Sequence, residues 1–298
     1  MKKIQFIDRK TGKIYQEIVP CEKWLQWLYY NPFGNLALKS VVKRKFFTQW
    51  YGKKMDRPHS KAKILDFVTN LDIDMNEVLR PLNDFTTFND FFIRQLKPEV
   101  RPINRNDNVI TSPADGKMLA FPCMHGLDTF FAKGQKFSLE ELLRDQYLIE
   151  KYTGCSLIII RLSPADCHRF YFPADGRISK SSKIDGAYYS VSSYAVKKKM
   201  HIYWENIREC SVLHTDNAGD ILLCEVGATM VGSIVQRYHT ETNVKKGQEK
   251  GWFKFGGSTI IVLFEKEKVQ IDFDIIENTK NGYETSIQIG EGIATISK

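Results

Sequence analysis

The residues with the clearest chemical potential are two glycines followed by two hydroxyl residues, Gly256-Gly257-Ser258-Thr259, close to the C-terminal end. The apolar run 260–264 follows them and is typical of a buried strand. Because glycine lacks a Cβ, the Gly257 carbonyl can be approached closely and held in a strained conformation. Attack by the Ser258 hydroxyl would convert this amide into an ester, whose elimination and hydrolysis would leave a pyruvoyl group. A tight turn leading into a core strand is the alternative.

Two other segments carry side chains that could assist such a reaction. Residues 112–116 (Ser-Pro-Ala-Asp-Gly) form a proline-led turn that would place the Asp115 carboxylate at a strand end. Residues 162–173 bring an imidazole, a guanidinium and a second carboxylate together. A histidine oriented by an aspartate is the general means of activating a serine hydroxyl. Each segment alone is typical of a turn, but together the three predict a catalytic site.

Metal and disulfide chemistry are not indicated. The six histidines show no H-x-x-x-H or H-E-x-x-H spacing, so no metal site is expected. The six cysteines include no C-x-x-C pair, which favours a reducing cytoplasmic setting over a zinc site or a disulfide framework. The segment that begins at Asp72 departs from a calcium loop, with Glu77 at the sixth position and Asn83 at the twelfth.

Composition and charge indicate a globular protein with acidic partners. The chain has 298 residues, an apolar content of 43% and a net charge of +8. Such a charge favours nucleic acid or an anionic membrane surface, and no nucleic-acid-binding module is recognised. The N-terminal residues do not form a signal peptide, and no apolar run approaches the about 20 residues needed to span a bilayer. Any contact with a membrane is therefore expected to be peripheral.

The pattern along the chain predicts an α+β protein with a helical region over residues 1–104 and a β-rich domain over 105–298. The stretch 21–55 mixes bases with large aromatic side chains, namely Trp24, Trp27, Tyr29, Tyr30, Phe33, Phe46, Phe47, Trp50 and Tyr51. Aromatic rings beside lysine and arginine suit a helix that lies among lipid headgroups. A core face or a dimer face is the alternative.

Short apolar runs separated by turn residues predict the strands of the second region, at 157–160, 221–223, 231–235 and 269–276. A capping box of Ser138 and Glu141 predicts a helix within this region. Thr87 with Asp90 predicts another helix start, before a phenylalanine ridge that is expected in the core. The stretch 181–199 is rich in Ser, Tyr and Lys and is expected to form a long loop.

Taken together, these motifs resemble the phosphatidylserine decarboxylases of the pyruvoyl-dependent kind. The resemblance covers most of the chain from about Phe85. It rests on several ordered segments: Phe88-Asn89-Asp90-Phe91-Phe92-Ile93-Arg94, Lys97-Pro98, Arg101-Pro102, residues 112–116, Leu162-Ser163-Pro164, His168-Arg169, Asn206 with Arg208, Val226-Gly227-Ala228, Val231-Gly232-Ser233-Ile234, and Gly256-Gly257-Ser258-Thr259.

The resemblance implies a proenzyme that cleaves itself between Gly257 and Ser258, giving a β chain of residues 1–257 and an α chain of residues 258–298. Ser258 would become the pyruvoyl cofactor, with Asp115, a histidine and Ser258 as the self-processing triad. The amine of phosphatidylserine would form a Schiff base with the pyruvoyl carbonyl, which acts as an electron sink for decarboxylation. His168 is then the candidate proton donor to the carbanion, and phosphatidylethanolamine is the product.

The resemblance also implies partners and a location. The two chains should stay together, on the cytoplasmic face of the cell membrane, and a homodimer is possible. Arg169 and Asp166 are candidate substrate-binding residues, and no metal is expected. The net positive charge suits an anionic lipid substrate.

One position departs from the pattern. The family commonly has a second histidine three positions after the first, where this chain has Tyr171. A tyrosine with a pKa of about 10 is a poor general base near neutral pH. Either His168 serves both functions, or self-processing is slow or uses Tyr171 differently. Tyr171 therefore leaves a lipid-binding pseudoenzyme that remains uncut as an alternative. A second alternative is a decarboxylase of another amino-acid headgroup, or of a soluble amino acid, that uses the same pyruvoyl chemistry.

Overall fold

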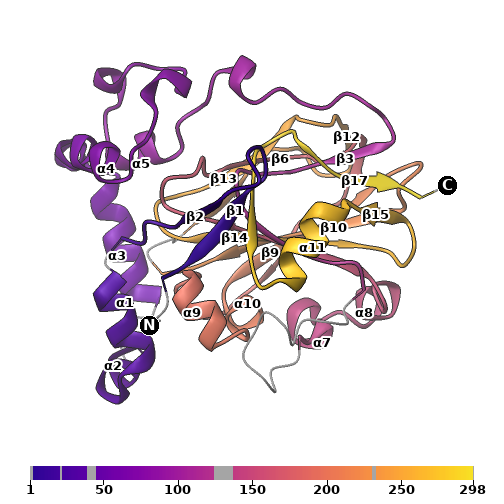
Figure 1. The fold of residues 1–298 in the computed structure, drawn as a ribbon, viewed down its shortest axis with the longest axis horizontal. Coiled ribbons are helices and arrows are strands. Elements are labelled where there is room, and N and C mark those ends of the chain that lie inside the picture. Colours follow the sequence, from indigo (N-terminus) through magenta and orange to yellow (C-terminus); the bar gives the residue numbers. More distant parts are fainter. Residues whose placement is uncertain (1–2, 21, 39–44, 124–136, 230–232, 298) are drawn as a thin grey trace.

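The computed structural model describes residues 3–20, 22–38, 45–123, 137–229 and 233–297, apart from the side chains of 45 and 47–49. Figure 1 shows the N-terminal helices, in indigo and purple, on one flank of a large sheet. The helices are α1 (Glu22–Tyr30), α2 (Pro32–Ala37), α3 (Lys45–Met55), α4 (Ile64–Asn70), α5 (Phe88–Phe92), α7 (Leu139–Leu143), α8 (Gln146–Lys151), α9 (Ser193–Lys198), α10 (Ile202–Glu205) and α11 (Phe273–Lys280).

The strands form one large sheet and two small ones. They are β1 (Gln5–Asp8), β2 (Ile14–Gln16), β3 (Val109–Thr111), β4 (Gly116–Phe121), β5 (Ser156–Leu162), β6 (Arg169–Tyr171), β7 (Gly176–Ile178), β8 (Ser182–Ile184), β9 (Arg208–His214), β10 (Asp220–Gly227), β11 (Ile234–Gln236), β12 (Thr242–Val244), β13 (Glu249–Phe253), β14 (Ser258–Phe264), β15 (Val269–Ile271), β16 (Glu284–Ile287) and β17 (Gly292–Ile296). The α+β prediction is confirmed.

The large sheet has the order β12-β7-β9-β10-β14-β5-β4-β16-β1-β2, with β8 paired to β9. Its strands are antiparallel except for the parallel pair β1 and β16. Strand β14 lies between β5 and β10. The small sheets have the orders β11-β13-β6 and β15-β17-β3. The residue that was predicted to react, Ser258, therefore begins a central strand.

The central strands β4, β5 and β14 of the large sheet are buried on both faces, which explains why they are rich in apolar residues. On one face Ile159 and Ile261 pack with residues of α1, α7, α9 and α10. On the other face Ile158 and Ile260 pack with residues of α11 and of the small sheets. A third cluster joins α3, α4 and α5 and includes Phe255, just before the two glycines. The strands predicted at 157–160, 221–223 and 260–264 are confirmed.

The local signals at helix starts are also confirmed. The Ser138 side chain accepts a hydrogen bond from the Glu141 N–H at the start of α7. Thr87 does the same for the Asp90 N–H at the start of α5. The phenylalanines of α5 are buried, as expected for a core ridge.

Three expectations about secondary structure were wrong. Residues 5–16 are not helical, because β1 and β2 form a hairpin that pairs with β16 and extends the large sheet. The stretch 181–199 is not a loop throughout, since it contains β8 and α9, whose Tyr194 and Val196 are buried. The run 269–276 contains the strand β15 and then the start of α11. Of the predicted run 231–235, residues 231 and 232 lie outside the described residues, as do residues 39–44 of the basic aromatic stretch.

Candidate active site

Ser258 stands at the first position of β14, where it pairs with Leu162 of β5 and Gly227 of β10. Its side chain is fully buried, and its Oγ has no hydrogen-bond partner within the part of the chain that the structure describes. A buried hydroxyl without a partner is uncommon, because desolvation is costly unless a hydrogen bond compensates for it. Such an atom is often found where a site serves chemistry rather than stability.

The two residues before Ser258 need to be glycine for different reasons. Gly256 has a φ of +137°, which is in the region that side chains rarely adopt. A Cβ on Gly257 would lie 3.0 Å from Cγ2 of Val191, closer than usual for such contacts. The backbone at the predicted cleavage point is therefore closely surrounded.

His168 lies just before β6 and is fully buried against Phe92, with ring centroids 4.0 Å apart. Its Nδ1 is 2.9 Å from the carbonyl oxygen of Asp166. Since a carbonyl oxygen can only accept, Nδ1 carries the hydrogen and Nε2 keeps a lone pair. Nε2 has no hydrogen-bond partner among the described residues.

The electrostatic surroundings keep His168 neutral. Burial lowers the pKa of His168 to about 4, with the Arg94 guanidinium acting in the same direction. The Asp166 residue and the Gly256 carbonyl oppose this shift. The effect of Gly256 links the imidazole ring to the glycine pair, one residue from the predicted cleavage point. His168 is therefore an unprotonated base at neutral pH.

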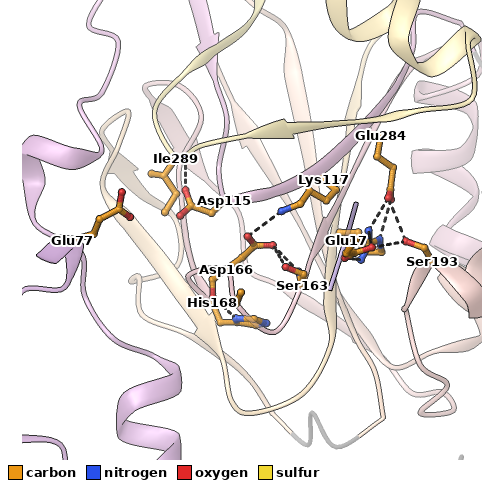
Figure 2. A network of polar contacts seen from close by, with 12 residues as sticks. Glu17, Glu77, Asp115, Lys117, Ser163, Asp166, His168, Ser193, Glu284 and Ile289 are labelled. Carbon is orange, nitrogen blue, oxygen red and sulfur yellow. Dashed lines mark hydrogen bonds and ion pairs between the residues drawn. The ribbon is translucent and has the colours of Figure 1, made fainter. Parts of the chain in front are cut away.

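Asp115 does not contact His168 (Figure 2). Its carboxylate accepts hydrogen bonds from the Arg101 guanidinium at 3.0 and 3.1 Å and from the Ile289 N–H at 2.7 Å. Burial raises the pKa of Asp115, and the contacts with Arg101 and Ile289 oppose this shift. Hydrogen bonds do not join the predicted triad of Asp115, His168 and Ser258 in this structure, and the role of Asp115 stays a prediction.

The other predicted site residues are engaged in contacts within the protein. The Asp166 carboxylate accepts from Ser163 N–H and Oγ at 2.7 Å and pairs with Lys117 at 3.3 Å. Arg169 binds the Ile93 carbonyl at 2.8 Å and forms an ion pair with Glu249. These contacts leave a substrate-binding role for Asp166 and Arg169 without support from the geometry.

Tyr171, which replaces the expected histidine, lies on β6 with its N–H bonded to the Pro113 carbonyl at 2.8 Å. Burial raises the pKa of Tyr171, and nearby Cys167, Glu249 and Asp115 raise it further. The phenol is therefore neutral over the physiological range and can donate a hydrogen bond, but it cannot act as a base there.

Two cavities meet at the glycine pair. An apolar cavity of about 270 Å³ is lined by Trp24, Leu25, Tyr51, Phe67, Gly256 and Gly257, among others. A smaller cavity of about 100 Å³ is lined by Glu17, Arg161, Ser190, Ser192 and Gly257, among others. Gly257 borders both, so the predicted cleavage point adjoins an apolar cavity and a second cavity in which charged and hydroxyl side chains stand among apolar ones. In the described ranges, no three His, Cys, Asp or Glu side chains are arranged to hold a metal ion.

Comparison with known proteins agrees with this geometry. The sequence model of phosphatidylserine decarboxylase matches residues 88–295. A phosphatidylserine decarboxylase proenzyme of Fusobacterium nucleatum is 56% identical over 97% of this chain and 97% of its own length. The proenzymes of Clostridium tetani and of Desulfitobacterium hafniense strain Y51 are 48% and 44% identical, over 97% and 99% of each chain.

The chain belongs to the phosphatidylserine decarboxylase family. The resemblance stated from the sequence is therefore confirmed, together with the prediction of a carboxy-lyase made as a proenzyme. Within the residues that the structure covers, no helix is both long and apolar enough to cross a membrane.

Several residues that hold the site in place have no role predicted from the sequence. Asn89 accepts a hydrogen bond from the Phe255 N–H at 2.9 Å and so ties the glycine pair to α5. Arg94 donates to the carbonyls of Ala165 and Asp166, which supports the turn that binds His168. Both residues stand in the motif 88–94. Polar residues that stand between the buried phenylalanines of this motif were the sequence signal that could have indicated their structural role.

Asn206 is the third such residue. Its side-chain nitrogen donates to the carbonyls of Tyr189 and Gly227 at 2.9 and 2.8 Å, and its oxygen accepts from the Tyr189 N–H at 2.9 Å. Gly227 is the strand partner of Ser258. Asn206 therefore joins the segment that covers Gly257 to the strand beside the serine.

Proposed function

We propose that the chain cleaves itself between Gly257 and Ser258 and, as two associated chains, decarboxylates phosphatidylserine to phosphatidylethanolamine. The proposal is carried by the buried Ser258 Oγ, which has no hydrogen-bond partner among the described residues and directly follows Gly256 and Gly257, where two cavities meet. The family supports the reaction class.

The self-cleavage proceeds through the chain's own groups. Ser258 Oγ attacks the Gly257 carbonyl carbon while His168 Nε2 takes the hydroxyl proton, and this proton passes to the Ser258 nitrogen as the Gly257–Ser258 C–N bond breaks, which converts the amide to an ester with a free amine. Elimination then removes the proton from Cα of residue 258, for which His168 Nε2 is again the proposed base, and breaks the Cβ–Oγ bond. Gly257 leaves as a carboxylate, and hydrolysis of the resulting dehydroalanine gives the pyruvoyl group and ammonia. The surroundings fit a pyruvoyl group at Ser258, since the position is buried, its Oγ has no competing hydrogen bond among the described residues, and the preceding Gly257 borders both cavities. When formed, this group supplies a carbonyl that binds the substrate amine and accepts electrons as carbon dioxide leaves.

After cleavage, His168 is the proposed proton donor to the reacting carbon: its Nε2, unprotonated at rest, takes up the one proton that each turnover consumes and passes it to that carbon. Its burial against Phe92 excludes bulk water from the ring, and its Nδ1 contact with Asp166 fixes the direction of Nε2. Asp115 is proposed to act on the site without a hydrogen bond to His168, since its carboxylate binds Arg101 and Ile289 and Nδ1 of His168 is bonded to the Asp166 carbonyl.

The lipid substrate is proposed to reach the site through the apolar cavity, whose wall includes the aromatic side chains of α1. Helices α1 to α3 expose large apolar side chains, namely Trp24, Trp27, Tyr30, Phe33, Leu36, Phe46 and Trp50. Exposed lysines Lys23, Lys53 and Lys54 accompany them. This mixture favours peripheral binding to an anionic leaflet, at the cytoplasmic face of the membrane.

The first test is the intact mass of the purified protein under denaturing conditions. Wild type should give two fragments that meet at Gly257 and Ser258, the smaller without a free amine, whereas Ser258→Ala should remain one chain. Thr259→Val is the matched control, because Thr259 is equally buried and its Oγ1 also lacks a partner among the described residues. It should cleave normally.

Other outcomes decide between the alternatives. A single uncut wild-type chain that binds anionic vesicles would make the pseudoenzyme the correct assignment. A cleaved chain that releases carbon dioxide from another amino-acid headgroup, and none from phosphatidylserine, would change the substrate but keep the chemistry.

A further inference from the structure

The small cavity beside Gly257 has a polar wall that the self-cleavage does not use. Glu17, which follows the N-terminal hairpin, lines it together with Arg161 of β5 and the serines at 190, 192 and 193. The cavity of about 100 Å³ has room for several water molecules or a group of similar size. The Glu17 side chain is buried here although it is charged, so its burial has to be compensated.

The compensation comes from a guanidinium that two carboxylates share (Figure 2). Arg161 donates to Glu17 through both terminal nitrogens at 2.9 Å, and to Glu284 through Nε at 2.9 Å and Nη2 at 2.7 Å. The Ser193 hydroxyl lies 3.2 Å from Glu17 and 3.3 Å from Glu284. Four of the five N–H groups of Arg161 are thus occupied.

The charge of this cluster favours a cation over an anion. Two carboxylates against one guanidinium leave an excess of negative charge, and Arg161 has little capacity for a third carboxylate. The positive charges of Lys117 and Lys197 act on Glu284, the carboxylate farther from the cavity, since together with Arg161 they lower the pKa of Glu284. Lys117 is itself paired with Asp166 at 3.3 Å. Glu284 does not line the cavity, whereas Glu17 does.

Glu17 also keeps acceptor capacity. A carboxylate has about four acceptor positions. In Glu17 three are taken, one on Oε1 by Arg161 and two on Oε2 by Arg161 and Ser193. The remaining position on Oε1 can accept one further hydrogen bond.

We infer that Glu17 is the receptor for the ammonium group of the phospholipid headgroup, which it holds in the small cavity next to residue 258. This inference rests on the proposed function and adds a specificity-determining residue to it. The apolar cavity on the other side of Gly257 takes the lipid body, so a headgroup without an amine finds no partner for Glu17. The N-terminal hairpin thereby contributes to substrate choice.

The test compares Glu17→Gln with Glu284→Gln in cleaved, full-length protein on micelles of phosphatidylserine. Both substitutions remove one charge from the same arginine and serine, but only Glu17 faces the cavity. Glu17→Gln should raise KM by about 10- to 100-fold, the loss expected for a hydrogen bond between charged groups, with kcat changed much less. Glu284→Gln should leave KM within about twofold of wild type.

Inhibition gives a readout that a purely structural role would not affect. Phosphatidylethanolamine, which keeps the amine, should inhibit Glu17→Gln at least about tenfold more weakly than wild type, while phosphatidic acid should inhibit both equally. Equal KM changes in the two variants, or equal loss of inhibition by both lipids, would overturn the inference. If Glu17→Gln does not accumulate, Glu17→Asp can replace it, because this variant keeps the carboxylate charge but moves it back by one methylene. An unchanged KM in Glu17→Asp would also overturn the inference.

Measurements on the wild-type protein distinguish a failure of this inference from a failure of the proposed self-cleavage and decarboxylation. An uncut wild-type chain, or a cut chain without decarboxylase activity, would reject the proposed function. A cut and active wild type whose KM does not respond at residue 17 would reject the role of Glu17 alone.

Discussion

Burial selects the protonation state of His168. An imidazole in water has a pKa of about 6.5, and in the folded protein burial lowers it to about 4. Between these two values the unfolded chain binds a proton that the folded chain does not. Folding is therefore opposed by acid in this window, and the free energy of unfolding should fall as the pH falls from about 6.5 to about 4.

Replacing His168 by Gln should remove this part of the pH dependence. The difference between wild type and His168→Gln should change by up to about 3 kcal/mol across the window, because each unit of pKa shift corresponds to about 1.4 kcal/mol. Urea unfolding of both proteins at several pH values, each on the Ser258→Ala background to keep one chain, measures it. If the free energies of unfolding of the two proteins depend on pH in the same way, His168 is protonated or exposed in the folded state.

The roles of single carboxylates were the part of the site hardest to predict. The sequence placed Asp115 and His168 in one site, but it could not show that the Asp166 backbone carbonyl occupies Nδ1. A backbone contact of this kind depends on the turn held by Ser163 and Arg94 rather than on residue type. The pairing of Arg101 with both Asp115 and Glu77 likewise joins segments that no local pattern relates.

Among the elements, β14 was predictable and the N-terminal hairpin was not. Strands β5, β10 and β14 are buried on both faces, so their sequences are continuous apolar runs that identify them. β1 and β2 contain four and three residues, and β2 is exposed throughout. They are strands because β16 offers a partner, which is a tertiary effect that overrides weak local preference. The buried helix α9 was missed for a similar reason.

Asn206 makes a prediction about how elements are joined. Asn206→Ala would remove the amide's hydrogen bonds to the Tyr189 N–H and to the Gly227 carbonyl in a buried place, whereas the Tyr189 carbonyl would keep the Thr229 N–H. The free energy of unfolding should fall by about 2–4 kcal/mol, and cleavage at Ser258 should slow because its strand partner is released. Urea unfolding and the time course of cleavage measure the two effects.

The control is Asn243→Ala on the exposed strand β12. A surface substitution of this kind should stay within about 0.5 kcal/mol of wild type and should cleave normally. If Asn206→Ala behaves like Asn243→Ala, the buried amide does not hold these elements together.

The whole molecule presents its exposed apolar side chains unevenly. Helices α1 to α3 lie together on one flank, and α11 lies on the other side of the large sheet from them (Figure 1). Phe33 and Phe46, on α2 and α3, are 76% and 80% exposed, and Phe273 on α11 is 73% exposed. Phe33 and Phe46 can therefore be used to test membrane binding by this flank, with Phe273 as a control of the same residue type and similar exposure.

The double variant Phe33→Ser with Phe46→Ser should bind anionic vesicles at least about tenfold more weakly, because each ring transferred from water contributes about 1.5–3 kcal/mol. Phe273→Ser should bind like wild type. Flotation with phosphatidylserine-containing vesicles measures both, and raised salt should weaken all of them by screening the basic surface. Equal loss in the two variants would argue against α1 to α3 as the membrane side, and loss of dimerisation instead would indicate a subunit interface.

The position of Ser258 at the start of β14 affects how the mature molecule can be made. Residues 258–298 include β14, which pairs on both sides with strands of the other fragment, and β16, which pairs with β1 and β4. The proenzyme can fold as a single chain, but after cleavage a denatured molecule would have to find a second fragment at the right concentration. Recovery then becomes a bimolecular reaction whose yield depends on dilution. The proposed cut would therefore make folding a step that only the proenzyme can complete as one chain, after which the lifetime of the molecule would depend on its rate of unfolding.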